Sequence, residues 1–205
     1  MEEKRDTLIK KALTLEYATV GWNVIEAGVA ISAGLAADSV ALIGFGLDSI
    51  IEVTAAVALI WRLTREAEEE TNAERRALLV VGLTFFALAA YVAFESAKTL
   101  WFREVPRESL VGIALAVASG IIMPWLGLAK RRLARQLGSK ALAADAVETL
   151  VCAWLSAILL AGLGLNSLFN WWWADPVAGL LMAGFIVREG WEAIEESRGE
   201  EGCGC

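Results

Sequence analysis

Ser39–Glu52 reads SVALIGFGLDSIIE, and one hundred positions later Ser139–Cys152 reads SKALAADAVETLVC. Each segment opens on a serine that is followed two positions later by Ala-Leu. Each also carries polar residues nine and thirteen positions after that serine, and these four residues are Asp48, Glu52, Glu148 and Cys152. A spacing of i, i+4 places both members of a pair on one face of a helix. The repeat therefore predicts two related helices that each offer two potential ligands to one ion.

The helices of the repeat belong to a strongly apolar chain. Hydrophobic residues make up 57% of its 205 positions, and the charged residues collect between long apolar runs. A bilayer core is crossed by roughly 20 apolar residues in a helix, and open sheets would leave backbone groups unpaired in lipid. We therefore expect an all-α membrane protein with six transmembrane helices, at Leu13–Ala36, Val40–Leu63, Ala77–Trp101, Ser109–Leu128, Ala141–Phe169 and Pro176–Glu195.

Basic residues set the expected orientation. Of the 18 Lys and Arg residues, all but Lys98, Arg103 and Arg107 fall on one side of these helices. The loop after the fourth helix contributes five cations to that side: Lys130, Arg131, Arg132, Arg135 and Lys140. Because basic loops remain on the cytoplasmic side, both termini are predicted to be cytoplasmic. The net charge of −7 argues against nucleic-acid binding.

This orientation makes the repeat an inverted one. The second helix would run inward and the fifth outward, so helices one to three are related to helices four to six, which is a transporter architecture. Glu52 and Cys152 each lie about 12 residues, or roughly 18 Å, along their helices and hence near the middle of the membrane. No buried Lys or Arg is expected near the acids, so a bound cation explains them better than interhelical hydrogen bonds between protonated acids.

The chemical types of the predicted ligands indicate which metal ion the site would prefer. The chain has no histidine, so metal binding would depend on carboxylates and a thiolate. Cys152 argues against calcium and magnesium, which prefer oxygen ligands, although a lone intramembrane cysteine is often only a small packing residue. We expect zinc as the substrate, with cadmium, cobalt, iron(II) and manganese as alternatives.

Other polar residues have open interpretations. Asn23 and Glu26 share one face of the first helix and could support the ligands, line a pathway or serve helix packing. Asp145 could line an access route or cap a helix. We place the transmembrane domain at residues 1–195 and an acidic, flexible tail at 196–205. In that tail Cys203 and Cys205 form a Cys-x-Cys arrangement, which could capture a soft metal or mark only an unstructured end. A prenylation signal is a remoter interpretation of this cysteine pair.

These residues resemble the cation diffusion facilitator family of divalent metal transporters. The resemblance covers helices one to six and is clearest in Ser39–Glu52 and Ser139–Cys152. In that family the second and fifth helices each donate an i, i+4 pair to a tetrahedral metal site, usually histidine or aspartate followed by aspartate. Asp48 and Glu52 match the first pair. Glu148 and Cys152 depart from the second pair, so the site position carries over while the metal preference does not.

The resemblance implies metal export from the cytoplasm by alternating access, with protons moving in the opposite direction, and a homodimer. It also implies a multi-pass protein of the membrane, which is the inner membrane in a prokaryote. Only a short tail follows the sixth helix, so the cytoplasmic domain usual in the family is not expected. The competing hypothesis is a metal-binding or scaffold membrane protein that does not transport. We do not expect an enzyme, since no nucleophile with a base and no phosphate-binding loop is visible.

Overall fold

The computed structural model describes residues 2–64 and 72–197, and it is helical over nearly all of them, with no strand in these ranges. The all-α prediction is confirmed. The six helices are α1 (Glu2–Ala37), α2 (Val40–Thr64), α3 (Asn72–Phe102), α4 (Leu110–Leu137), α5 (Lys140–Phe169) and α6 (Ala174–Ser197).

Five of the helices are long and apolar enough to cross a membrane. They are α1 to α5, over the ranges Arg5–Ala37, Val40–Trp61, Gly82–Phe102, Leu110–Leu137 and Ala141–Phe169. The sixth helix, α6, is 24 residues long, but its second half carries Arg188, Glu189 and Glu192. A membrane position for α6 therefore remains a prediction.

The boundary predicted at Leu128 is wrong. The α4 helix continues to Leu137 and ends where Gly138 takes a left-handed conformation with φ of 65°. The basic residues from Lys130 to Arg135 are therefore helical, and only a two-residue turn separates α4 from α5. Leu133, Ala134 and Leu137 continue the inward apolar face, which explains why the helix does not end with the hydrophobic run.

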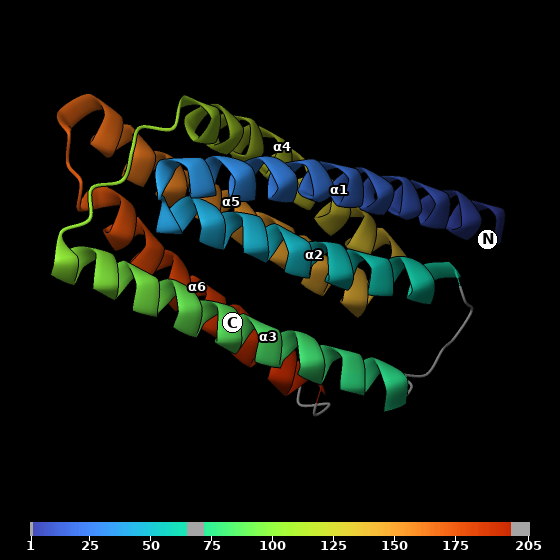
Figure 1. Cartoon of the computed structure of the whole chain (residues 1–205). Helices are drawn as coiled ribbons and strands as arrows, with labels where there is room; N and C mark the ends of the chain where they lie inside the picture. The colour runs from blue at the N-terminus through green and yellow to red at the C-terminus, as the bar shows by residue number, and fades with distance from the viewer. Residues whose placement is uncertain (1, 65–71, 198–205) are drawn as a thin grey trace.

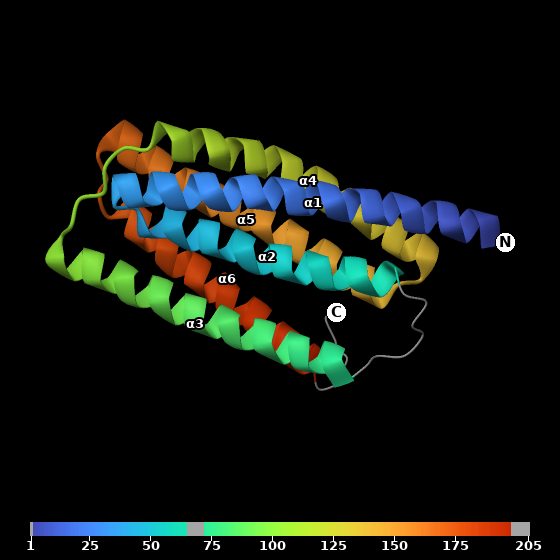
Figure 2. The same cartoon turned by 45° about the vertical axis from the view of Figure 1, so that its right-hand side comes forward.

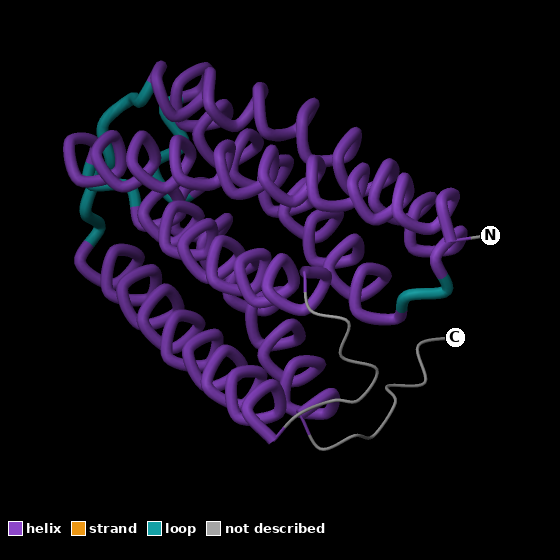
Figure 3. The backbone as a smooth tube through the Cα atoms, turned by 90° about the vertical axis from the view of Figure 1, so that its right-hand side faces the viewer, coloured by secondary structure: helices purple, strands orange, loops and turns teal. Residues whose placement is uncertain are grey.

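The helices form three neighbouring pairs (Figures 1 and 2). The most extensive contacts join α1 with α2, α4 with α5, and α3 with α6. Contacts of α1 with α4 and of α2 with α5 unite the first two pairs into a four-helix bundle, which α3 and α6 flank. Figures 1 and 3 show the connections α1–α2, α3–α4 and α5–α6 at the end opposite the start of α1, and the α4–α5 turn at the end where α1 begins. We call the end where α1 begins the N-terminal end.

The Ser-x-Ala-Leu repeat marks equivalent helix starts. The Oγ of Ser39 accepts a hydrogen bond from the Leu42 amide at 3.2 Å, and Ser139 Oγ accepts one from Leu142 at 3.3 Å. In each case a left-handed residue precedes the serine, Asp38 before α2 and Gly138 before α5. The repeated serines therefore cap helices at tight corners, because a side-chain oxygen satisfies an amide that the first helical turn leaves free.

The two caps differ in one respect that can be tested. Ser39 Oγ also donates to the buried Asp175 of α6 at 2.5 Å. We expect Ser139→Ala to lower the free energy of unfolding by about 1 kcal/mol, the usual value of an N-cap. We expect Ser39→Ala to lower it by about 1 kcal/mol more, since a buried carboxylate oxygen loses its donor. Equilibrium unfolding of both variants in detergent measures the difference, and equal losses would contradict it.

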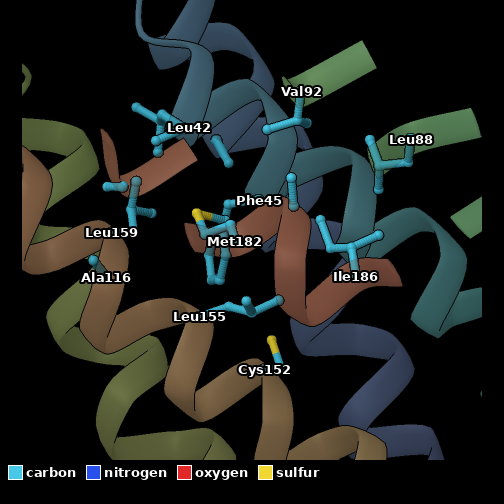
Figure 4. Close-up of a cluster of buried hydrophobic side chains, with 14 of the residues drawn as sticks. Leu42, Phe45, Leu88, Val92, Ala116, Cys152, Leu155, Leu159, Met182 and Ile186 are labelled. Atoms are coloured by element: carbon cyan, nitrogen blue, oxygen red, sulfur yellow. The ribbon is translucent and has the colours of Figure 1, made fainter. Parts of the chain in front are cut away.

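The main apolar core lies where α2, α5 and α6 meet. Its largest buried side chains include Leu42, Phe45, Leu155 and Met182. Figure 4 shows these residues converging from different helices, with Cys152 at the edge of the cluster about one turn from Leu155. The core therefore fixes the α2–α5 contact beside the predicted metal ligands.

Candidate metal site

Three of the four predicted ligands come together. Asp48 and Glu52 lie on the inward face of α2, and Cys152 faces them from α5. They are 4%, 7% and 1% exposed. One donor atom from each lies within 4.8 Å of the other two, and no other group of this kind is found in the part of the chain that the structure describes.

These separations suit a small cation after modest adjustment. In a tetrahedral zinc site, bonds of about 2.0–2.3 Å place neighbouring donors roughly 3.3–3.8 Å apart. Since the donor atoms of Asp48, Glu52 and Cys152 lie within 4.8 Å of one another, they would need to close by no more than about 1.5 Å, which side-chain rotation can supply. The site therefore offers two carboxylates and one thiol, a mixed oxygen and sulfur set.

Glu148 is placed differently from the other predicted ligands. It lies one turn from Cys152 on α5, but its side chain is only half buried and it is not a member of the three-residue group. It is close enough to interact electrostatically with Glu52. Of the predicted pair on α5, the structure thus brings Cys152 to the site and leaves Glu148 at its margin.

Asn23 contacts one of the predicted ligands, Glu52. Its Nδ2 donates a hydrogen bond to Glu52 Oε2 at 2.7 Å, and Asn23 is fully buried on α1. Its Oδ1 has no hydrogen-bond partner. The bond holds one oxygen of Glu52 toward α1 and limits the rotation of the carboxylate.

Glu26 is buried on α1 about one turn from Asn23 and faces other polar side chains. Ser49 Oγ donates to Glu26 Oε2 at 3.3 Å, whereas Glu26 Oε1 has no partner. The Trp22 indole nitrogen and Ser119 Oγ are also buried without a partner. Several unsatisfied polar atoms in one region are a sign of water or an ion, because unpaired buried polar groups are otherwise costly.

Asp145 belongs to a buried ion pair. Its Oδ2 accepts a hydrogen bond from Lys130 Nζ at 2.5 Å, and the same ammonium donates to Glu16 Oε2 at 3.0 Å. Lys130 is fully buried. Lys130, which the predicted boundary at Leu128 places in a loop, is therefore a buried cation. Its ion pairs are with Glu16 and Asp145 and not with the three acids for which no buried cation is expected, although it also attracts Glu52. Continuation of the apolar pattern to Leu137, with Gly138 as a stop, was the signal for a longer helix.

Glu189 of α6 was not predicted as a site residue. It is buried at 8% exposure and is close enough to Asp48 to interact electrostatically. Glu189 lies in the charged second half of α6, and no sequence pattern there distinguishes it from acidic residues that face solvent. Cys203 and Cys205, predicted as a possible metal-capturing pair, lie outside the described residues, as does the predicted tail beyond residue 197.

The charges around the three-residue group are mainly negative. Glu26, Glu148 and Glu189 surround Asp48, Glu52 and Cys152, and Lys130 is the one buried cation among the residues whose burial is described. Carboxylates in an apolar interior are stable only when protonated or paired with a cation. The arrangement therefore favours a divalent cation, which pairs with several carboxylates at once.

Comparison with known proteins agrees with this chemistry. Residues 17–200 match a family described as the cation efflux transmembrane domain. Transmembrane protein 163 of Xenopus laevis is 25% identical over 183 residues, which cover 88% of this chain and 65% of that protein.

Two bacterial relatives have names that state a metal function. The manganese efflux system protein MneS of Bacillus subtilis is 21% identical over 203 residues, covering 95% of this chain and 69% of that protein. A cadmium, cobalt and zinc/H(+)-K(+) antiporter of Bacillus velezensis is 24% identical over 201 residues, covering 92% and 61%. The chain thus spans less than two thirds of the length of the Xenopus protein and of the antiporter.

Proposed function

Because this chain belongs to the cation efflux family, we propose that it exports a divalent transition-metal cation and holds it on Asp48, Glu52 and Cys152. The observation that carries the proposal is the convergence of these three donors within 4.8 Å in a buried site. Such a group is expensive to maintain in an apolar bundle unless it binds a cation. If the protein carries a cation, the energetic cost of burying these carboxylates is offset whenever the cation is bound.

Zinc is the proposed substrate. The Cys152 thiolate favours zinc or cadmium, and the carboxylates accommodate either. Relatives named for manganese and for cadmium, cobalt and zinc support the class of substrate. Glu148 is proposed as the fourth ligand, reached when the α2–α5 contact closes on the metal. Asn23 and Glu26 are proposed to support the site from α1.

Export is proposed to proceed by alternating access with proton exchange. The four-helix bundle and the α3–α6 pair are two units that could move relative to each other around the site. The matched pairs α1–α2 and α4–α5 support an inverted repeat. One relative is named as a cadmium, cobalt and zinc/H(+)-K(+) antiporter, and carboxylates that lose a metal can take up protons in its place. Cytoplasmic termini, a homodimer and an inner-membrane location belong to the same proposal.

Metal flux into proteoliposomes tests this function. Purified protein is reconstituted with a pH dye inside, and zinc, cadmium, cobalt, iron(II) and manganese are added in turn. We expect zinc uptake with proton movement in the opposite direction. Metal bound specifically at Glu52 without flux of any metal would instead identify a binding or scaffold protein, which is the second candidate function.

Asn23→Ala tests the supporting role of α1. We expect metal affinity to fall by about 10- to 100-fold, the usual effect of removing a group that orients a ligand. Isothermal titration of zinc into detergent-solubilised protein measures it. Asn166→Ala is the matched control. Asn166 is also buried, but it donates its hydrogen bond to the carbonyl of Pro106, which is not part of the proposed metal site. Equal affinities of the two variants would contradict the role.

Cys152→Asp tests the origin of metal preference. An oxygen-only ligand set favours harder cations than a set containing a thiolate. We therefore expect the variant to lose cadmium and zinc affinity while manganese affinity is kept or increased. Competition between cadmium and manganese for the protein measures the change. An unaltered cadmium to manganese ratio would remove Cys152 from the ligand set.

A further inference from the structure

A buried ion cluster joins three helices of the bundle. Lys130 of α4 donates to Glu16 of α1, to Asp145 of α5 and to Thr149 Oγ1 at 3.3 Å. The Lys130 and Glu16 side chains are fully buried, and that of Asp145 is 11% exposed. This ion cluster, Glu16–Lys130–Asp145–Thr149, is not part of the three-residue metal group. Two of its members, Asp145 and Thr149, nevertheless lie on α5 with Cys152.

The ion cluster lies between the metal site and the N-terminal end of the bundle. Asp145 precedes Cys152 by seven residues on α5, which is roughly 10 Å along the helix axis. Because α5 begins at the N-terminal end, Asp145 is the nearer of the two to that end. Lys130 is also close enough to attract the Glu52 carboxylate. A cation that moves between the metal site and the N-terminal end must pass this level.

An apolar layer closes the bundle beyond the ion cluster. Ala12, Leu59, Ala134 and Leu142 form a separate buried cluster, with one residue from each of the four helices. Ala12 and Leu142 lie one turn before Glu16 and Asp145, and Ala134 lies one turn after Lys130. Each therefore falls on the side of the ion cluster that faces the N-terminal end. We call these four residues the apolar plug.

The charge balance of the ion cluster is suited to a cation. One ammonium faces two carboxylates, and Glu16 Oε1 is buried without a partner. The carboxylates and the Thr149 hydroxyl thus form an oxygen-lined position that the ammonium of Lys130 already fills. A metal ion arriving at this level would meet the same oxygens and would displace the ammonium to pass.

We propose that the ion cluster and the apolar plug form the closed gate on the N-terminal side of the transport path, with Lys130 as a tethered cation that occupies the path. The gate rests on the proposed function. In this structure the ion pairs tie α1, α4 and α5 together beside the metal site. Opening toward the N-terminal end requires Lys130 to leave Asp145 or Glu16, and an entering cation stabilises the carboxylates that it leaves.

Access of a reagent to Cys152 tests the gate without metal transport. Cys203→Ser and Cys205→Ser leave Cys152 as the single cysteine of the full chain. A membrane-impermeant methanethiosulfonate is then applied to oriented vesicles from either face. In the otherwise unchanged protein we expect slow labelling from the N-terminal face. In a variant with Glu16→Gln, Lys130→Met and Asp145→Asn, we expect labelling from that face to be at least about tenfold faster. The reason is that the conformation with the gate open, which is a minor state in the parent protein, becomes the major state.

Two further variants sharpen the result. Lys130→Arg keeps the charge and should label as slowly as the parent. Asp145→Asn leaves Lys130 and Glu16 as a charge-balanced pair, so we expect this variant to fold even if the triple variant does not. Cys152 in this variant should still be labelled faster than in the parent from the N-terminal face.

Unchanged labelling in both the triple variant and Asp145→Asn would overturn the gate, as would equal acceleration from the two faces, which indicates loosened packing. Since labelling needs no metal, an inactive transporter leaves this outcome readable. Conversely, an active transporter with unchanged labelling refutes the gate alone.

Discussion

Asp48→Asn and Glu52→Gln are each expected to reduce metal flux in proteoliposomes to the level of protein-free vesicles. Each change keeps the size of the side chain but removes one negative charge from a buried three-donor group. The remaining ligands neutralise a divalent cation poorly, and the cost of taking the ion out of water is then no longer offset. Zinc flux measured with an internal metal dye records the loss.

Matched controls make this result specific. Asp38→Asn and Glu95→Gln are the same substitutions at side chains that lie outside the metal site, in ion pairs with Arg107 and Lys98. Flux should be retained in both. If Asp48→Asn and Glu52→Gln kept normal flux while remaining folded, the metal site would have to lie elsewhere and the proposed mechanism would fail with it.

Lys130→Met is expected to have the largest effect on stability. The change leaves Glu16 and Asp145 facing each other in an apolar interior with no cation between them. Removing one partner of a buried ion group costs about 3–5 kcal/mol, because the remaining charge is uncompensated. Unfolding in mixed detergent micelles, followed by circular dichroism, measures the loss of free energy.

The uncharged triple variant separates lost charge from lost packing. Adding Glu16→Gln and Asp145→Asn to Lys130→Met removes the uncompensated carboxylates, so most of the lost stability should return. Lys98→Met is the control, because Lys98 pairs with Glu95 at a partly exposed position and its loss should matter little. A triple variant as unstable as Lys130→Met would show that the aliphatic part of Lys130, and not its charge, stabilises the bundle.

The predicted ligand pairs were accessible from sequence because helical geometry is local. A spacing of i, i+4 puts Asp48 with Glu52 on one face whatever surrounds them, and the repeat points to Cys152 as their counterpart. The fourth prediction, Glu148, shows the limit of this reasoning. The direction in which Glu148 points from α5 relative to α2 depends on how the two helices pack, and the structure leaves Glu148 half buried at the margin of the metal site.

The Lys130 cluster could not be found in the same way. Glu16 and Lys130 are 114 residues apart, and no local pattern states that they meet. A hydrophobic run that ends at Leu128 reads as the end of a membrane helix, because a lysine in the membrane is expensive unless it is paired. The pairing partners decide whether the position is tolerated, and they come from two other helices.

The sequence by itself thus determined the helical fold with its apolar spans and the helix face shared by each predicted ligand pair, because hydropathy and helical periodicity act over a few residues. Only the tertiary structure decided that Asn23 holds Glu52, that Glu189 approaches Asp48 and that Asp145 is bound to Lys130. Burial of a charge and the identity of its partner are set by contacts between distant helices, and those contacts exist only in the packed bundle.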